Sequence, residues 1–259
     1  MLLKDRVAIV SGIGPGMGRD ISLACAREGA HLVLAARGAD KLTAVAEEVR
    51  HLGRRALCVP TDIARADDCR RLVEAAHAEH GRIDVLVNNA FRGGLEPPMA
   101  DADMNEWRKI FDVNVFGSLQ LTQAVVPHMR DRGGGSIVFI NSMSMRIIEP
   151  KFGGYAASKG ALMIAAQTLA RELGRDKIRV NSVVPGHIDG PNLRIFFQME
   201  AKRLGIGEDE VSARIAAEGV LGHIATSEEV AEAVLFFASA QSAAVTGQSL
   251  HVNAGQYFA

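Results

Sequence analysis

The hydrophobic pattern of the chain consists of short apolar runs separated by longer amphipathic stretches. Most of the runs are unbroken, which is typical of strands that are covered on both faces of a parallel sheet. The expected strands are residues 7–10, 31–36, 56–59, 85–88, 136–141, 179–184 and 249–252. The amphipathic stretches predict helices over residues 18–28, 40–51, 67–80, 104–116, 119–130, 155–174 and 227–239. This alternation predicts βαβ units, and their right-handed crossovers favour an α/β fold with a doubly wound parallel sheet.

Residues 190–222 interrupt this alternation, because they contain two helix-like segments, 193–204 and 208–217, with no strand between them. In doubly wound sheets, ligands bind beyond the carboxyl ends of the strands. An insertion just before the last helix and strand is therefore placed to fold over that crevice as a substrate lid, although ordinary packing explains its apolar side chains equally well. We expect a single domain, residues 1–259, in which residues 190–222 form a small helical lid.

The composition excludes several classes of protein. Lys and Arg number 29 against 30 Asp and Glu, so the chain lacks the basic excess of a nucleic-acid-binding or polybasic membrane-binding protein. No stretch approaches the roughly 20 apolar residues of a transmembrane helix, and no signal peptide is apparent. Cys25, Cys58 and Cys69 are too few and too scattered for a disulfide framework, which favours a reducing compartment. No metal is expected either, because His77 and His80 lack a recognised ligand motif. We therefore expect a soluble, cytoplasmic protein with no nucleic-acid or membrane partner.

A glycine-rich segment, SGIGPGMG over residues 11–18, follows the first expected strand and leads into the first helix. Glycines in such a turn let the backbone approach a pyrophosphate, and the helix N-terminus supplies free N–H groups and a favourable dipole. Turns collect glycine anyway, so the position between a strand and a helix is what makes this segment informative. We expect Gly12, Gly16, Met17 and Gly18 to bind the phosphates of a dinucleotide.

The end of the second expected strand bears on which dinucleotide binds. The acidic residue expected about 20 residues after the glycine-rich turn, where it would bind the ribose hydroxyls, is absent, and Arg37 follows the strand instead. A guanidinium can clamp the 2′-phosphate that a carboxylate would repel. Arg37 therefore favours NADP(H), although it would also serve as an ordinary solvated charge. Asp40 is within reach of the ribose as well, which keeps NAD(H) as an alternative.

Two further strand ends are candidate cofactor contacts. Asp62 and Ile63 follow the third expected strand, where the Asp62 carboxylate would accept a hydrogen bond from the adenine amino group. Asn89 and Ala90 follow the fourth, where their backbone would line the cofactor. Both segments are also ordinary turn sequences.

Tyr155 and Lys159 form the most informative pair in the sequence. Residues four apart on a helix lie on one face, with Cβ atoms about 5–6 Å apart. An ammonium beside a phenol favours the phenolate and so lowers a phenol pKa that starts near about 10. Such a tyrosine can pass a proton to or from a carbonyl or alcohol oxygen near neutral pH. Taken alone, a Tyr/Lys pair at this spacing is only moderately specific.

Two polar residues are candidates to support that pair. Ser142 ends the fifth expected strand on the ligand side of the sheet, where its hydroxyl would bond the substrate oxygen; a turn or helix-cap hydroxyl is the alternative. Asn114 lies inside an expected helix, where Asn has poor propensity. It is a candidate to hold a water in a proton relay, and a local bond from its side chain to the backbone is the alternative.

Together these positions resemble the short-chain dehydrogenase/reductase family, in its short single-domain branch. The resemblance spans essentially the whole chain, in the family's order and spacing, and is carried by Gly12, Gly16, Gly18, Asp62, Asn88, Asn89, Ala90, Asn114, Ser142, Tyr155, Lys159, Pro185 and Gly186. It implies a seven-stranded Rossmann-like sheet with helices on both faces. It also implies a homotetramer or homodimer formed through the long helices over residues 104–130 and 155–174.

The same resemblance implies hydride transfer between a nicotinamide and the carbonyl or alcohol carbon of a small-molecule substrate. Tyr155 would be the acid/base, and Lys159 would lower its pKa and bind the nicotinamide ribose. Ser142 would orient the substrate oxygen, and Asn114 would support a water relay. A dinucleotide-binding scaffold without turnover is the competing class, but a scaffold has no need of this matched set. The remaining cofactor contacts that the resemblance implies are Pro185, Gly186 and Ile188.

Three positions depart from the family's pattern. Phe91 replaces the glycine that usually follows Asn-Asn-Ala, which places an aromatic ring against the cofactor or substrate. Gly190 replaces a threonine that usually contacts the nicotinamide carboxamide, a contact that would pass to Asn192 or a backbone group. Pro15 lies where relatives that use NADP often carry a basic residue, which weakens the case for NADP(H).

Several residues around the expected crevice are candidate substrate contacts, and Phe91 is one of them. Met143 and Phe152 lie between Ser142 and Tyr155 and suit an apolar pocket wall, although packing against the lid would use them equally. Arg146 and His187 lie near the expected mouth and are candidates to contact a polar or anionic group. The mostly apolar surroundings favour a medium to large, mostly apolar ketone or secondary alcohol.

Overall fold

The computed structural model describes residues 1–258, apart from the side chain of Asn192. Seven parallel strands form its main sheet, in the order β3-β2-β1-β4-β5-β6-β9. Their bounds are β1 (Val7–Ser11), β2 (His31–Ala36), β3 (Ala56–Pro60), β4 (Val85–Asn88), β5 (Gly135–Ile140), β6 (Ile178–Pro185) and β9 (Ser249–Val252). Each strand matches an apolar run of the sequence to within about one residue at either end. The predicted Rossmann-like sheet is confirmed.

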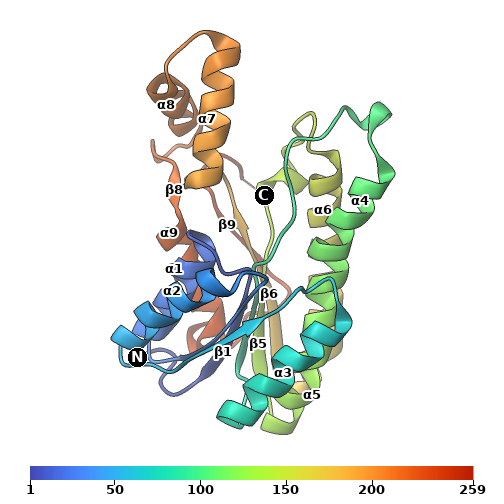
Figure 1. The fold of residues 1–259 in the computed structure, drawn as a ribbon, viewed down its shortest axis with the longest axis vertical. Coiled ribbons are helices and arrows are strands. Elements are labelled where there is room, and N and C mark those ends of the chain that lie inside the picture. Colours follow the sequence, from blue (N-terminus) through green and yellow to red (C-terminus); the bar gives the residue numbers. More distant parts are fainter. Residues whose placement is uncertain (259) are drawn as a thin grey trace.

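Helices cover both faces of this sheet (Figure 1). Alternate side chains of a strand point to opposite faces, so Ala8 and Val10 of β1 pack on one side and Val7 and Ile9 on the other. Helices α1, α2 and α9 complete the first apolar layer, and α3, α5 and α6 complete the second. Their bounds are α1 (Met17–Arg27), α2 (Ala39–His51), α3 (Ala66–His80), α5 (Ser118–Arg132), α6 (Gly153–Leu173) and α9 (Ser227–Ala238).

The segment that interrupts the sequence pattern forms two helices, α7 (Pro191–Leu204) and α8 (Glu208–Glu218). Figure 1 shows them standing clear of the main sheet. They share a small apolar core of their own, which includes Leu193, Phe197 and Val211. A two-stranded parallel sheet, β7 (Ile188–Asp189) with β8 (Ala225–Thr226), joins the base of this pair to the rest of the fold.

The helix expected over residues 104–116 is two elements in the structure. Helix α4 (Met104–Phe111) passes into a π-helical turn, Asp112–Gly117, which continues directly into α5. Such turns are rare and often lie at functional sites, and Asn114 is in the middle of this one.

None of the helices in the described part of the chain is both long and apolar enough to span a bilayer. Residues 1–258 also contain no group of three or more His, Cys, Asp or Glu side chains arranged to hold a metal ion. The exposed His77 lies against His128, with ring centroids 4.6 Å apart, and His80 stacks on His31.

Candidate active site

The candidate site lies where the carboxyl ends of β1, β4, β5 and β6 meet. The strand order reverses between β1 and β4, because β2 and β3 lie on one side of β1 and the later strands on the other. Open α/β sheets bind ligands in the crevice at this switch point. The structure brings the glycine-rich turn, Asn89, Ser142 and Tyr155 to this end of the sheet.

The glycine-rich turn divides into packed and open positions. Gly12 has φ +76°, and a Cβ on it would lie 2.5 Å from the Cα of Ala90. A Cβ on Gly18 would lie 2.5 Å from the carbonyl oxygen of Gly12, so both positions require glycine. Nothing lies within 4 Å of a Cβ built on Gly14 or Gly16, and α1 begins at the next residue without a side-chain cap. Open space beside free helix N–H groups fits the pyrophosphate of a dinucleotide.

The other expected adenosine contacts lie at neighbouring strand ends. Arg37 is exposed directly after β2. The Asp62 carboxylate accepts a hydrogen bond from Ala64 N at 3.1 Å, which is the turn chemistry that its sequence allows. Ile63 is buried and packs against Gly117 of the π-helical turn.

Tyr155 and Lys159 share one face of α6, as their spacing predicts. The Lys159 Nζ lies 5.6 Å from the centroid of the Tyr155 ring and donates a hydrogen bond of 2.7 Å to the carbonyl of Ile140, at the end of β5. Only 2% of Lys159 is exposed, whereas Tyr155 is partly buried. Ser142 follows β5, and its hydroxyl accepts hydrogen bonds from the backbone N–H and the hydroxyl of Ser144.

Burial dominates the electrostatics of this group. It raises the pKa of Tyr155, and the Ser142 hydroxyl offsets part of that rise. It also lowers the pKa of Lys159 to about 7, because burial disfavours the charged ammonium. The net shift of the Tyr155 pKa is therefore upward in this arrangement, opposite to the direction expected from a neighbouring Lys159. The Lys159 Nζ lies 5.6 Å from the ring centroid, and desolvation of the phenol is the largest effect on the Tyr155 pKa.

The side chain of Asn114 is completely buried, and both polar atoms of its carboxamide form hydrogen bonds. Its Oδ1 accepts a hydrogen bond from Arg92 N at 2.7 Å, and its Nδ2 donates to Arg92 O and to Ser158 Oγ, both at 2.9 Å. The Ser158 hydroxyl donates in turn to the carbonyl of Tyr155. The carboxamide of Asn114 thus connects the π-helical turn to α6 and to the segment after β4. These partners are distant in sequence, and the bonds are not the local ones that the sequence offered as an alternative.

Phe91 lies directly against the candidate acid/base residue. Its ring meets the Tyr155 ring at 64°, with centroids 6.2 Å apart, and 52% of Phe91 is exposed. Met143 is 9% exposed, Phe152 is partly buried just before α6, and Arg146 is exposed.

The turn after β6 is held by the C-terminal segment. The Gln256 side chain accepts a hydrogen bond from His187 N at 3.1 Å, and its Nε2 lies 2.9 Å from His187 Nδ1. Burial lowers the pKa of His187, so its Nδ1 accepts from the Gln256 amide and its Nε2 carries the proton. The ring also stacks on Phe196 of α7. Pro185 is buried, Ile188 is partly buried, and a Cβ on Gly186 would lie 2.4 Å from Gln256 Oε1.

Comparison with known proteins identifies the family of the chain. The family model described as enoyl-(acyl carrier protein) reductase matches residues 12–256, which is nearly the whole chain. The chain belongs to the short-chain dehydrogenase/reductase family. It is 36% identical over 261 residues to an uncharacterized oxidoreductase of Methylorubrum extorquens, and the match covers 98% of each protein.

Two solved structures of the family are particularly similar. L-Sorbose reductase from Gluconobacter frateurii, complexed with NADPH and L-sorbose, is 31% identical, with a TM-score of 0.93 over 99% of this chain and 98% of that one. A 7α-hydroxysteroid dehydrogenase complexed with NADH and 7-oxo glycochenodeoxycholic acid is 32% identical, with a TM-score of 0.88 over 98% and 94%. As a short-chain dehydrogenase/reductase, the chain is an NAD(P)-dependent oxidoreductase that acts on CH–OH or C=O groups.

This short-chain dehydrogenase/reductase also holds its site with bonds that the sequence did not reveal. Asn89 Nδ2 donates to the carbonyls of Ser11 and Gly12, and Ser11 Oγ accepts from the backbone N–H groups of Asn89 and Ala90. These bonds fasten the glycine-rich turn to the end of β4. Glu96 accepts from the backbone N–H groups at the start of α6. Neither Asn89 in this role nor Glu96 has a signal in local sequence, because the partners are 58–79 residues apart.

Proposed function

We propose that this protein transfers a hydride between NADP(H) and a ketone or secondary alcohol, with Tyr155 as the acid/base. The observation that carries the proposal is the grouping of Tyr155, Ser142 and Lys159 at the carboxyl ends of the strands, beside a glycine-rich turn that fits a pyrophosphate. The dinucleotide, when bound, supplies or accepts the hydride. The protein's own side chains handle the substrate oxygen and its proton.

Each catalytic side chain has a distinct task in this proposal. The Tyr155 phenol is protonated at neutral pH, so it can donate a proton to a carbonyl oxygen as that oxygen gains charge. Ser142 orients that oxygen by hydrogen bonding. Lys159 binds the nicotinamide ribose and exchanges protons with the phenol, for which a pKa of about 7 is well matched. Asn114 supports a water relay by shaping the π-helical turn, since its side chain is engaged elsewhere.

Arg37 supports NADP(H) as the preferred cofactor, with NAD(H) as the alternative. We expect Arg37→Asp to raise the KM for NADPH about 10- to 100-fold, because a charge-assisted hydrogen bond is worth about 1.5–3 kcal/mol. The KM for NADH should fall or stay the same. Steady-state kinetics with both cofactors measures the ratio of the two KM values. The control is Arg27→Asp, the same charge reversal at the C-terminal end of α1. An unchanged ratio in Arg37→Asp would remove this residue from cofactor selection.

The substrate is proposed to be medium to large and mostly apolar. Phe91, Met143 and Phe152 would form the apolar wall, and Arg146 and His187 would contact a polar or anionic group. The neutral, Gln256-bound state of His187 makes its Nε2 a hydrogen-bond donor, which suits an oxygen of the substrate. Helices α7 and α8 lie within residues 190–222 and have an apolar core separate from that of the sheet. They would act as the lid over the substrate crevice.

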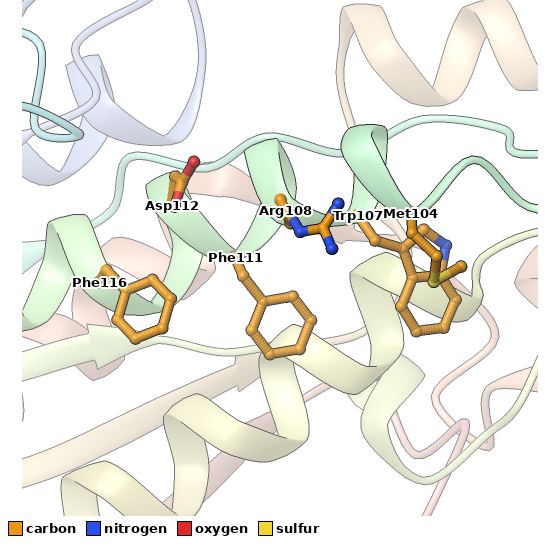
Figure 2. A pocket seen from close by; sticks show the side chains of 6 residues that line it. All are labelled: Met104, Trp107, Arg108, Phe111, Asp112 and Phe116. Atoms are coloured by element: carbon orange, nitrogen blue, oxygen red, sulfur yellow. The ribbon is translucent and has the colours of Figure 1, made fainter.

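We also propose that the protein is a homodimer or homotetramer. An apolar groove runs along α4 and the π-helical turn, and Figure 2 shows the rings of Phe111 and Phe116 projecting from the same side. Phe116 is 52% exposed, and Ile164 of α6 is 57% exposed. A second copy pairing through these helices would cover both. Light scattering that finds only a monomer would contradict this assembly.

A cytoplasmic location is proposed from the thiols. Cys25, Cys58 and Cys69 are all free. Burial raises the pKa of Cys25 to about 12 and that of Cys69 to about 11, so these thiols act as buried apolar groups. Three unpaired thiols suit a reducing compartment.

A panel of ketones with NADPH and with NADH tests the function itself. Oxidation of the reduced nicotinamide should depend on a ketone and on the protein, and the alcohol product should appear in equal amount. The competing proposal is a dinucleotide-binding scaffold. Nucleotide binding without turnover on any member of a broad panel would favour the scaffold over the enzyme.

A further inference from the structure

The first turn of α6, the helix that carries Tyr155, has little stabilisation from its own residues. Helix α6 starts with Gly153 and Gly154, and its preceding residue, Phe152, provides no side-chain cap. Glycine adds backbone freedom and loses more of it on folding than other residues, and the first N–H groups of a helix have no partner inside the helix. Tyr155 is the third residue of this turn, so the position of its phenol depends on how rigidly the turn is held.

A carboxylate from another segment supplies the missing cap. Glu96 Oε2 accepts a hydrogen bond from Gly154 N at 3.1 Å, and Glu96 Oε1 accepts one from Tyr155 N at 3.3 Å. The backbone N–H of Glu96 donates to the carbonyl of Lys151 at 2.8 Å, which adds a bond just before the helix. A partly buried carboxylate at a helix N-terminus is favoured by both its hydrogen bonds and the helix dipole.

The packing around Gly154 shows how closely this cap fits. A Cβ on Gly154 would lie 2.8 Å from Glu96 Oε2 and 3.1 Å from Trp107 Nε1, and a Cβ on Gly153 would lie 3.0 Å from the Trp107 ring. The same loop reaches the phenol, because a Cβ on Gly93 would lie 2.8 Å from Tyr155 Cδ2. Because Gly153 and Gly154 lack side chains, Glu96 and Trp107 can approach the backbone of the first turn closely.

We propose that Glu96 is a positioning residue for Tyr155: its carboxylate fixes the first turn of α6 and ties that turn to residues 91–98, which contact the Tyr155 ring. This inference rests on the proposed role of Tyr155. Glu96 acts through the helix and touches neither the substrate nor the cofactor.

Glu96→Ala, compared with Asp101→Ala, tests this proposal in the full-length protein with NADPH and a ketone from the panel. Asp101 is an exposed acidic residue that lies, like Glu96, in the segment between β4 and α4, so its loss should leave kcat unchanged. Glu96→Ala should lower kcat about 10- to 100-fold, because a displacement of about 1 Å in a reacting group has effects of this size. KM for the ketone and Kd for NADPH should stay close to wild type. Glu96→Gln keeps one acceptor oxygen and should restore part of kcat.

Trp107 provides a readout that does not depend on turnover. It is the only tryptophan of the chain and packs on Gly153 and Gly154, so its fluorescence reports on the first turn of α6. Glu96→Ala should make this fluorescence more easily quenched by acrylamide, and Asp101→Ala should not.

Gly154→Ala keeps the proposal testable if Glu96→Ala does not fold. The added methyl group displaces the carboxylate while Glu96 itself is intact, so kcat should fall in the same way, and Glu96→Ala/Gly154→Ala should lose no more than either single variant. Unchanged kcat in Glu96→Ala or in Gly154→Ala overturns the proposal, as does a parallel loss of kcat and NADPH binding. Full activity of Tyr155→Phe would instead overturn the proposed function, so the two failures are distinguishable.

Discussion

Tyr155→Phe is expected to lower kcat for carbonyl reduction about 10²- to 10⁴-fold, the usual contribution of a general acid. The variant keeps the ring that packs against Phe91 and Gly93 and removes only the hydroxyl oxygen. Nucleotide binding should therefore survive, and titration of the bound nucleotide's fluorescence measures it beside the turnover assay.

The matched control is Tyr257→Phe, because Tyr257 is the other of the two tyrosines in the chain. It also loses a phenolic oxygen, and its ring lies near His251. Its kcat should match that of the wild type. If Tyr155→Phe kept kcat near wild type, the phenol would not be the proton donor.

Lys159→Met is expected to reduce turnover by a comparable factor, about 10²-fold or more, while making the fold more stable at neutral pH. Burial lowers the pKa of Lys159 to about 7, from an ordinary value of 10.5. Between these pH values the unfolded chain holds more protons at this site than the folded chain does, so the stability contributed by this site rises with pH through that window. Methionine keeps a long apolar side chain and removes the cost of leaving water as an ammonium.

Thermal unfolding at several pH values between 7 and 10 tests this prediction. The Tm of Lys159→Met should exceed that of the wild type at pH 7, and the difference should shrink as the pH rises. Lys41→Met, at an exposed position of α2, controls for the loss of a lysine as such. A lower Tm for Lys159→Met at pH 7, or turnover close to wild type, would contradict the role given to this buried amine.

The sequence was sufficient for the sheet and for much of the site's placement. Strands buried on both faces leave unbroken apolar runs, and the ends of such strands converge on one edge of a parallel sheet. Residues such as Gly12, Ser142 and Asn89 could therefore be placed at that edge from their positions alone. The pairing of Tyr155 with Lys159 followed from helical spacing.

What the sequence could not predict depends on partners that are distant along the chain or on burial. The π-helical turn is held by bonds from Asn114 to Arg92 and Ser158, which are 22 and 44 residues away. The cap from Glu96 crosses 58 residues to Gly154. The upward direction of the Tyr155 pKa shift depends on desolvation of the phenol, which the sequence does not reveal, whereas a neighbouring lysine is visible in sequence.

A crystal structure of the protein with NADP⁺ bound tests the central claim most directly. We expect the pyrophosphate to lie at the free backbone N–H groups of Met17 and Gly18, at the start of α1, and the nicotinamide ring to lie beside the hydroxyls of Tyr155 and Ser142. A dinucleotide bound elsewhere, or a Tyr155 oxygen directed away from the nicotinamide, would contradict it.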